Sequence, residues 1–354
     1  MNAQRRFLNN LMKWVLMAVL CTSALLETAF DLCAAADLPA VRAIPEVLVH
    51  IDQQGSNHPG LALALIVDKS RQQARLYHYD GYWQIVAKWP CSTGKLAGPK
   101  QREGDQRTPE GVYFVTRNVA GRYLSETYGA YALTLDYPNL LDEHLSHSGS
   151  AIWLHGTDKP LRDRESNGCI VFENAAISRL AHFMRLNRTP VIIVDRFRFQ
   201  TLKDAQQLTA KILAATAMWH EAMMAGSFDE FHAWYAHDAG PSMHWWQRWC
   251  RQRRRTGLGQ RYRSIMSQRS IYKSGDYYIL LFDHYLRTAS RSQWVGRRKL
   301  FLQVVDNQVR IFGDTYQAAA CKHKDPLFYS WRALWKNGSD TRDLASKLKS
   351  GQDS

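Results

Sequence analysis

Apolar runs of strand length alternate with polar turns through the first half of the chain. Residues 61–67 read "LALALIV", and the runs "ARLYHY" and "YWQIVAKW" flank an Asp-Gly pair, which is a strong signal for a tight hairpin. A long polar loop that begins at Cys91 closes with "TPEG", a turn sequence that leads into an expected strand at residues 112–116. The run "AIWL" then leads directly into His155, and "PVIIVD" ends at Asp195. This pattern predicts a sheet.

The segment from residue 173 to residue 187 has a different hydrophobic period. One face carries apolar residues and the other is polar, as in an amphipathic helix that packs on a sheet. The apolar face consists of Ile177, Leu180, Ala181 and Met184. We therefore expect residues 60–196 to form a mostly β domain with little helix.

The pattern changes to helical periodicity after Phe199. Residues 202–225 are expected to form one helix, and Ser227 with Glu230 forms a capping box that predicts the next. A third helix is expected from Pro241, and four strand-like segments follow it. Three helices leading into a curved antiparallel sheet predict an α+β domain.

Aromatic residues recur at helical spacing in this second domain. Such spacing is typical of a buried core, and a platform for glycan or peptide is the alternative. The residues are Trp219, Phe231, Trp234, Tyr235, Trp245, Trp246 and Trp249. The predicted organisation is a signal peptide at 1–36, a linker at 37–59, the β domain at 60–196, the α+β domain at 203–318 and a polar tail at 319–354.

The N-terminal run "WVLMAVLCTSALL" has 13 residues, fewer than the roughly 20 that a spanning helix needs. Basic residues precede it, and Ala34 and Ala36 occupy the positions of a cleavage site, so we expect a secretory signal cleaved near Ala36. An uncleaved N-terminal anchor is the alternative, and it would be the protein's only attachment to a membrane. Either way the expected location is the periplasm.

Four cysteines follow the expected cleavage site, too few for a disulfide scaffold in a chain of this length. If a pair is bridged, Cys250 with Cys321 is the expected one, because both lie in the C-terminal half. A thiol that stays reduced in an oxidising compartment needs a reason, and catalysis is one.

The net charge of +14 includes seven arginines between Arg248 and Arg263. A patch of this kind attracts polyanions, but no zinc-finger spacing or RNA-recognition motif accompanies it. We therefore expect no nucleic-acid partner and interpret the run as a solvated basic face or as an attraction to acidic envelope polymers.

One imidazole and one thiol lie in the polar stretch that starts at His155. A thiol attacks an amide carbonyl as the thiolate, so it needs a base within reach and donors for the oxyanion. His155 ends a strand, and Cys169 follows Ser166, Asn167 and Gly168 in a tight turn, where the backbone N–H groups of Gly168 and Cys169 are candidate oxyanion donors.

The carbonyl of Gly156 is placed to orient the imidazole. A buried inert cysteine beside a surface histidine is an alternative interpretation, and a zinc site with His144, His147, His155 and Cys169 is another, although this spacing fits no standard site. The loop 136–149 is expected to be either a lid or a plain surface loop, and Ser92, Thr93 and Thr108 are expected to form turns.

Four motifs occur in a fixed order, namely "CSTGK", "TPEGVYFV", "HGT" and "SNGCI". Together they resemble the L,D-transpeptidase catalytic domain (YkuD type) over about residues 60–196. The resemblance implies that Cys169 is the acyl-accepting nucleophile and His155 the general base, with backbone groups of Gly156, Gly168 and Cys169 assisting. It implies no cofactor and no metal. The implied substrate is a peptidoglycan stem peptide, attacked at the bond after its third residue.

Two positions depart from the family pattern. Asn167 stands where the family usually has a second histidine, and Val171 stands where most members carry Arg or Asn; both positions help to hold the substrate and the turn. Residues 203–318 resemble a nuclear transport factor 2-like cone, through which an envelope protein is the expected further partner. The combination resembles cell-shape-determining murein L,D-carboxypeptidases.

The open question is the acceptor, water or an amine. A murein-binding scaffold with a decayed catalytic turn and an amidase that releases a wall-linked lipoprotein are the alternatives.

Overall fold

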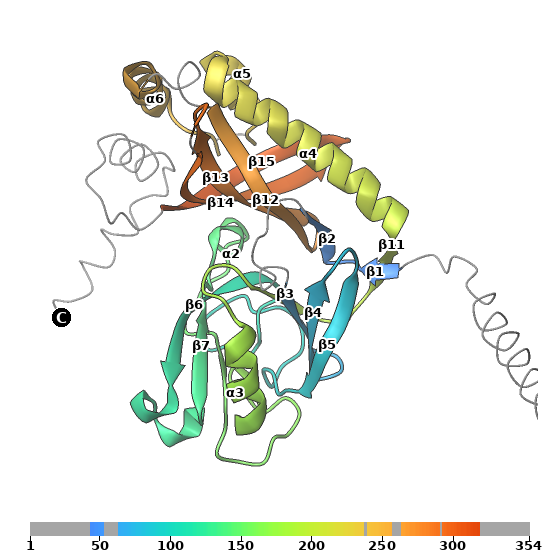
Figure 1. Cartoon of the computed structure of the whole chain (residues 1–354). Coiled ribbons are helices and arrows are strands. Elements are labelled where there is room, and N and C mark those ends of the chain that lie inside the picture. Colours follow the sequence, from blue (N-terminus) through green and yellow to red (C-terminus); the bar gives the residue numbers. More distant parts are fainter. Residues whose placement is uncertain (1–42, 53–62, 237–238, 257–262, 291, 319–354) are drawn as a thin grey trace, which may run out of the picture. The chain divides into compact units, whose positions relative to one another are not determined.

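The computed structural model describes residues 43–52, 63–236, 239–256, 263–290 and 292–318 (Figure 1). The predicted signal peptide, Cys321 and the whole of the predicted tail lie outside these residues, so the proposed Cys250–Cys321 bridge is not tested. Within the described ranges no helix is long and apolar enough to cross a membrane.

The first half forms an eight-stranded sheet in the order β5-β4-β3-β10-β6-β7-β8-β9. Its strands are β3 (Leu63–Asp68), β4 (Gln73–Tyr79), β5 (Trp83–Pro90), β6 (Gly111–Ala120), β7 (Tyr131–Leu135), β8 (Trp153–His155), β9 (Ile170–Val171) and β10 (Pro190–Val194). The predicted hairpin is confirmed, because β4 and β5 pair in antiparallel register across the turn that contains Gly81.

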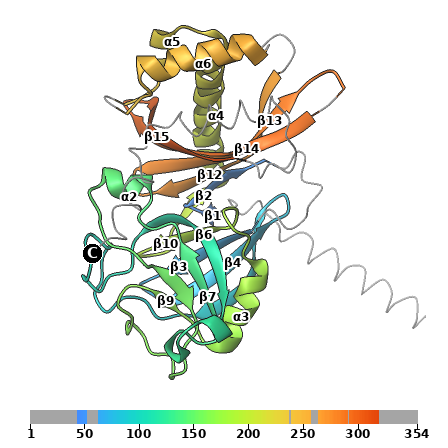
Figure 2. The same ribbon diagram turned by 90° about the vertical axis from the view of Figure 1, so that its left-hand side faces the viewer.

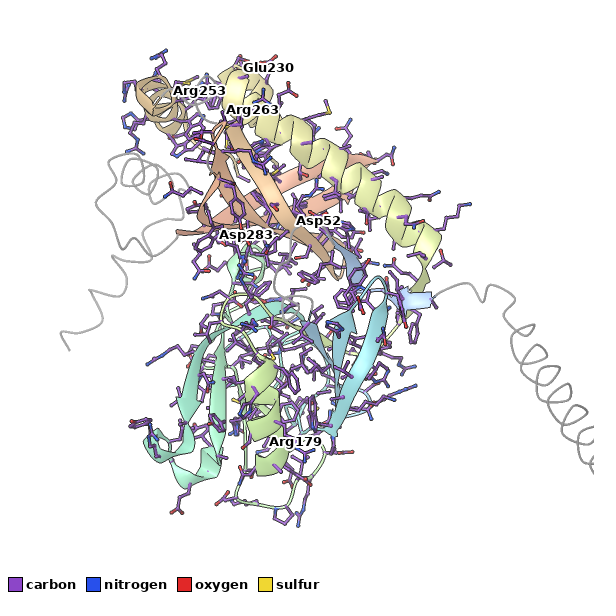
Figure 3. The ribbon with its side chains drawn as sticks, viewed as in Figure 1. Asp52, Arg179, Glu230, Arg253, Arg263 and Asp283 are labelled. Atoms are coloured by element: carbon purple, nitrogen blue, oxygen red, sulfur yellow. The ribbon has the colours of Figure 1, made fainter. Side chains whose placement is uncertain are left out.

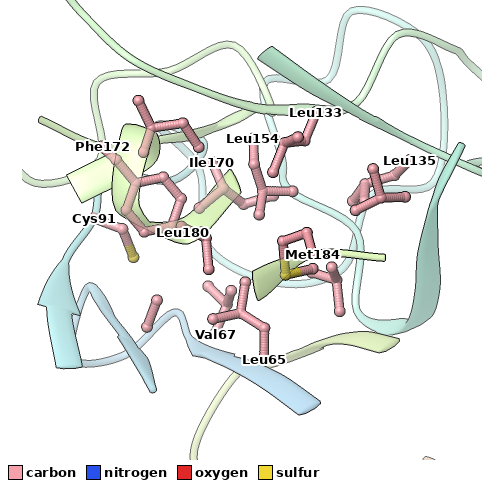
Figure 4. Close-up of a cluster of buried hydrophobic side chains, with 14 of the residues drawn as sticks. Leu65, Val67, Cys91, Leu133, Leu135, Leu154, Ile170, Phe172, Leu180 and Met184 are labelled. Carbon is pink, nitrogen blue, oxygen red and sulfur yellow. The ribbon is translucent and has the colours of Figure 1, made fainter. Parts of the chain in front are cut away.

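The centre of this sheet is apolar on both faces. β3 is buried along nearly its whole length and pairs in parallel with β10, as expected for a continuous apolar run. α3 (Asn174–Phe183) confirms the predicted amphipathic helix, since Ile177 and Leu180 are buried. Figure 4 shows the core that results, with Leu65, Leu154, Leu180 and Cys91 among its side chains. The remaining short helices here are Gly121–Tyr123, Glu126–Tyr128 and α2 (Leu140–His144).

The second half forms a five-stranded sheet in the order β15-β14-β13-β12-β2. Its strands are β2 (Leu48–Ile51), β12 (Arg263–Ser274), β13 (Tyr277–Arg287), β14 (Ser292–Val305) and β15 (Gln308–Ala318). Three helices accompany it, α4 (Leu202–Ala225), α5 (Phe228–His232) and α6 (Met243–Thr256), and α4 runs along the sheet in Figures 1 and 2. The prediction of a mostly β domain followed by an α+β domain is confirmed.

Six of the seven aromatic residues named for the second domain are buried in its core, as the spacing favoured, whereas Trp234 is half-buried and lines a cavity. Trp219, Trp249 and Phe231 are fully buried, and the flat rings of Trp245 and Trp249 stack 5.9 Å apart. The predicted capping box is present, because Ser227 and Glu230 satisfy each other's backbone groups. Asp283 on β13, labelled in Figure 3, is buried and accepts hydrogen bonds from Arg297.

A strand that the sequence did not reveal comes from the segment expected to be a linker. β2 pairs in antiparallel register with the edge of β12 that does not contact β13, so β2 is an edge strand of the five-stranded sheet. A second short strand, β1 (Ala43–Pro45), pairs with β11 (Phe199–Thr201). The domain boundaries otherwise stay predictions.

Candidate active site

Strand alternation separates a core face from a cavity face at the end of the first sheet. β8 and β9 run parallel, with Leu154 opposite Ile170 and His155 opposite Val171. Leu154 and Ile170 are fully buried in the core. His155, Cys169 and Val171 point the other way and line one cavity of about 340 Å³, a usual size for a small-ligand site.

The cavity, which we call the thiol cavity, has a second wall from the chain that follows His155. Side chains from residues 157–167 form much of it, and Ser92 and Tyr128 complete it. Among the described residues, none from the loop 136–149 lines this cavity. That loop instead contains α2, capped by Asn139.

His155 is held with its ring in one orientation. Its Nδ1 lies 2.6 Å from the Gly156 carbonyl oxygen. A carbonyl only accepts, so Nδ1 carries the proton and Nε2 keeps its lone pair. Burial lowers the pKa of His155, and the Gly156 carbonyl partly opposes this shift. The ring is therefore a neutral base at pH 7.

Two neighbours explain the local sequence around this base. The Tyr128 ring meets the His155 ring edge-on with 5.0 Å between centroids, which limits its rotation. A Cβ on Gly156 would lie 2.2 Å from Asn174 Oδ1, an atom that accepts a hydrogen bond from the Ala130 N–H. A side chain at position 156 would therefore displace Asn174 from this hydrogen bond.

The Cys169 thiol is half-buried and protonated at neutral pH. Burial raises its pKa, while a hydrogen bond from the Trp153 backbone and the positive charge of Lys100 oppose the rise. Its Sγ donates to the Ala151 carbonyl oxygen at 3.5 Å. A thiol in this state needs a base, and His155 lines the same cavity.

The turn before Cys169 is fixed by Ser166 and Gly168. Ser166 Oγ donates to the Cys169 carbonyl at 2.6 Å and accepts from the Gly168 N–H at 3.1 Å. Gly168 has φ +137°, and a Cβ there would lie 2.9 Å from the Arg107 carbonyl oxygen. The Gly168 N–H, predicted as an oxyanion donor, is thus occupied by Ser166, whereas Asn167 is exposed and lines the thiol cavity.

A buried glutamine that the sequence did not single out ties the segment before β4 to Thr93 and to Arg164, two residues before Ser166. Gln72 Nε2 donates to the Lys69 carbonyl and to Thr93 Oγ1, at 2.6 and 2.7 Å. Its Oε1 accepts from the N–H groups of Thr93 and Arg164, at 2.8 and 3.0 Å. All four hydrogen-bonding positions of the amide are therefore used.

Thr108 makes a direct link to the turn before Cys169. Its Oγ1 accepts from the Gly94 N–H at 2.8 Å and donates to the Gly168 carbonyl at 2.9 Å. The side chain is fully buried. Ser92 and Val171 add two backbone hydrogen bonds of 2.8 Å each. The residues expected to form turns thus hold the Cys169 turn by direct hydrogen bonds.

The histidines of the alternative zinc site do not gather. His144 stacks on Phe312 with 4.7 Å between centroids, and His147 Nδ1 lies 3.7 Å from Asp142 Oδ1. His155 and Cys169 line the thiol cavity without them. Within the described residues no group of metal-binding side chains is present.

Comparison with known proteins finds a family match over the part of the chain that holds this site. Residues 63–193 match the family model of the L,D-transpeptidase catalytic domain, YkuD. YafK of Escherichia coli (strain K12), a candidate L,D-transpeptidase, is 33% identical over 97 residues. That match spans 27% of this chain and 35% of the relative, so about a third of the relative's length is covered.

Two solved structures resemble both domains together. Bd1075 of Bdellovibrio bacteriovorus has a TM-score of 0.64 at 21% identity, covering 79% of this chain and 100% of its own. Pgp2 of Campylobacter jejuni, a helical cell shape determining protein, has a TM-score of 0.56 at 19% identity, covering 77% and 93%. At these identities the likeness concerns the fold.

Proposed function

We propose that the protein is an exported cysteine enzyme acting on peptidoglycan stem peptides, a proposal supported by the match of residues 63–193 to the family model of the L,D-transpeptidase catalytic domain, YkuD. The bond attacked is the one that follows the third residue of the peptide. The observation that carries the proposal is the shared cavity of the Cys169 thiol and a neutral His155 whose Nε2 lone pair is free of the Gly156 contact.

The first half-reaction forms a thioester. His155 Nε2 takes the thiol proton as Cys169 Sγ attacks the carbonyl carbon of the third residue. The carbon–nitrogen bond then breaks, and His155 returns the proton to the amine of the departing fourth residue. Because Ser166 occupies the Gly168 N–H, we assign oxyanion stabilisation to the Cys169 N–H and to the exposed amide of Asn167.

The second half-reaction releases the peptide. With His155 as base, water gives hydrolysis and an L,D-carboxypeptidase, whereas an amine gives a new cross-link and an L,D-transpeptidase. Both outcomes use the same thioester, so the choice depends on which acceptor reaches it. The fold likeness to Pgp2 concerns both domains and leads us to propose a role in cell shape.

The remaining assignments complete the proposal. We place the enzyme in the periplasm, delivered by the N-terminal segment, and assign the α+β domain to the recruitment of an envelope partner. The alternative of a decayed scaffold is less favoured, because the base, the thiol and the network around Gln72 and Thr108 are all present.

Mass spectrometry of residues 37–354 incubated with disaccharide tetrapeptide tests the function directly. Loss of one alanine without dimers is the result expected of a carboxypeptidase, and dimers are expected of a transpeptidase. Cys169→Ala should give neither product. If the wild-type protein leaves the tetrapeptide intact while Cys169→Ala still binds murein, the proposed activity on stem peptides is wrong, and the murein-binding scaffold or the lipoprotein-releasing amidase replaces it.

A further inference from the structure

The wall of the thiol cavity that faces away from the strands carries three charged side chains. Lys159, Arg162 and Glu165 all line the cavity and come from the segment that follows His155. We propose that Lys159 binds the terminal carboxylate of the substrate peptide, that is, the carboxylate of the residue released when the thioester forms. The inference rests on the proposed function and adds a determinant of substrate specificity to it.

The other two cationic side chains near the thiol already form ion pairs with carboxylates. Lys100, whose charge acts on Cys169, is buried and lies 2.9 Å from Asp105. Arg162 Nη1 lies 3.4 Å from Glu165 Oε1, and both of these side chains are largely exposed. Among the described residues, no ion pair includes Lys159, and Val171 contributes no charge to the cavity. Lys159 is thus the lining cation that an incoming carboxylate meets without displacing an acidic partner.

The backbone around Lys159 is fixed in relation to the base. The Lys159 N–H donates to Thr157 Oγ1 at 3.1 Å, and Pro160 restricts the conformation of the residue before it. Thr157 is joined to His155 through Gly156 alone, whose Cα packs closely against Asn174. The backbone that carries Lys159 is therefore tied to Thr157, and its exposed side chain lines the same cavity as His155.

The chemistry of the departing residue fits this arrangement. When the carbon–nitrogen bond breaks, the released amino acid has its amine at His155 and its carboxylate on the α-carbon that carries this amine. A cation that holds this carboxylate contributes to substrate and transition state alike, so its removal should raise KM and leave kcat nearly unchanged. A peptide whose terminal carboxylate is replaced by a carboxamide should lose the same contribution.

Two peptides and two variants test the inference. The peptides are a disaccharide tetrapeptide with a free C-terminal carboxylate and the same molecule with a C-terminal carboxamide. For the wild type we expect KM to be about tenfold lower for the carboxylate. Lys159→Gln should remove this preference by raising KM for the carboxylate only. Lys95→Gln, an equal charge change on an exposed side chain outside the cavity lining, should keep it.

A binding measurement keeps the inference separate from the proposed function. In the Cys169→Ala background, calorimetry should give a Kd about tenfold lower for the carboxylate than for the carboxamide, and Lys159→Gln should abolish the difference. If Lys159→Gln weakens the binding of both peptides equally, or if the Cys169→Ala protein binds the two peptides with the same Kd, the assignment of Lys159 is wrong. A wild type that binds with this preference but turns over neither peptide would instead contradict the proposed function.

Discussion

Cys91 and Cys169 lie on two neighbouring segments of one domain and have opposite surroundings. Burial raises the pKa of both thiols. Cys91 is 1% exposed and packs in the apolar cluster of Figure 4, whereas Cys169 lines a cavity with His155. A raised pKa alone therefore does not identify a reactive cysteine; access and a base do.

The difference arises from the two-residue period of extended chains. Ser92 pairs with Val171 and lines the thiol cavity, so Cys91, one residue earlier, points into the core. On the partner segment, Val171 lines the cavity and Ile170 is buried. If the pairing register of either segment shifted by one residue, the side chains that now face the core would face the cavity, and those that face the cavity would face the core.

The largest expected contrast comes from removing the nucleophile. Cys169→Ala should lower turnover of tetrapeptide roughly 10⁴-fold or more, because no other group forms the thioester. The fold should persist, since the half-buried side chain contributes little to the core. Steady-state kinetics and circular dichroism check this, and substantial residual turnover would exclude Cys169 as the nucleophile.

Removing the base should have the next largest effect. His155→Ala is expected to lower kcat about 10²- to 10⁴-fold, because the protonated thiol then lacks an acceptor for its proton. In the wild type the neutral ring is the active form, and burial lowers its pKa from 6.5. Activity should therefore persist below pH 6.5 and fall only as the ring becomes protonated. An acidic limb above pH 6.5 in the pH profile of kcat/KM would contradict this account.

Loosening the turn should have an intermediate effect. Thr108→Val removes the hydroxyl and leaves the Gly94 N–H and the Gly168 carbonyl without their partner. We expect kcat to fall about 10- to 100-fold, because a small displacement of the nucleophile is costly. The unfolding free energy should fall by about 1–3 kcal/mol. Thr108→Ser retains the hydroxyl and should restore kcat; equal kcat values for the valine and serine variants would remove the positioning role.

The smallest effect should come from the other cysteine. Cys91→Ala is expected to leave kcat unchanged and to lower the free energy of unfolding by roughly 1–2 kcal/mol, through a small cavity in the core. Urea unfolding and steady-state kinetics measure the two quantities. A marked loss of activity with unchanged stability would mean that the core and the cavity are not separate regions, contrary to the comparison.

Local patterns in the sequence predicted most of the elements. The hairpin around Gly81, the helix with Ile177 and Leu180, and the capping box at Ser227 depend on residues a few positions apart, and each is confirmed. The candidate pair, Cys169 and His155, was also identified from sequence motifs, and the cavity brings both together. Their chemical roles stay a prediction.

The features that the sequence did not reveal depend on distant partners. β2 has an ordinary short apolar pattern, and its place beside β12 comes from pairing across more than two hundred residues. Gln72 gave no signal, because its role lies in contacts with Thr93 and with Arg164, which is 92 residues away. Tyr128 likewise gave no signal in the sequence, because its role lies in ring contacts with His155 and Trp153.

The sequence by itself determined the two domains, the kinds of element in each and the candidate chemistry of the polar turn, because these depend on local periodicity and on motif order. The tertiary structure decided which cysteine faces the cavity, which nitrogen of His155 is free of the Gly156 carbonyl, and that the Gly168 N–H donates to Ser166 Oγ. These depend on register and on hydrogen bonds between segments far apart in the chain, and no local pattern encodes them.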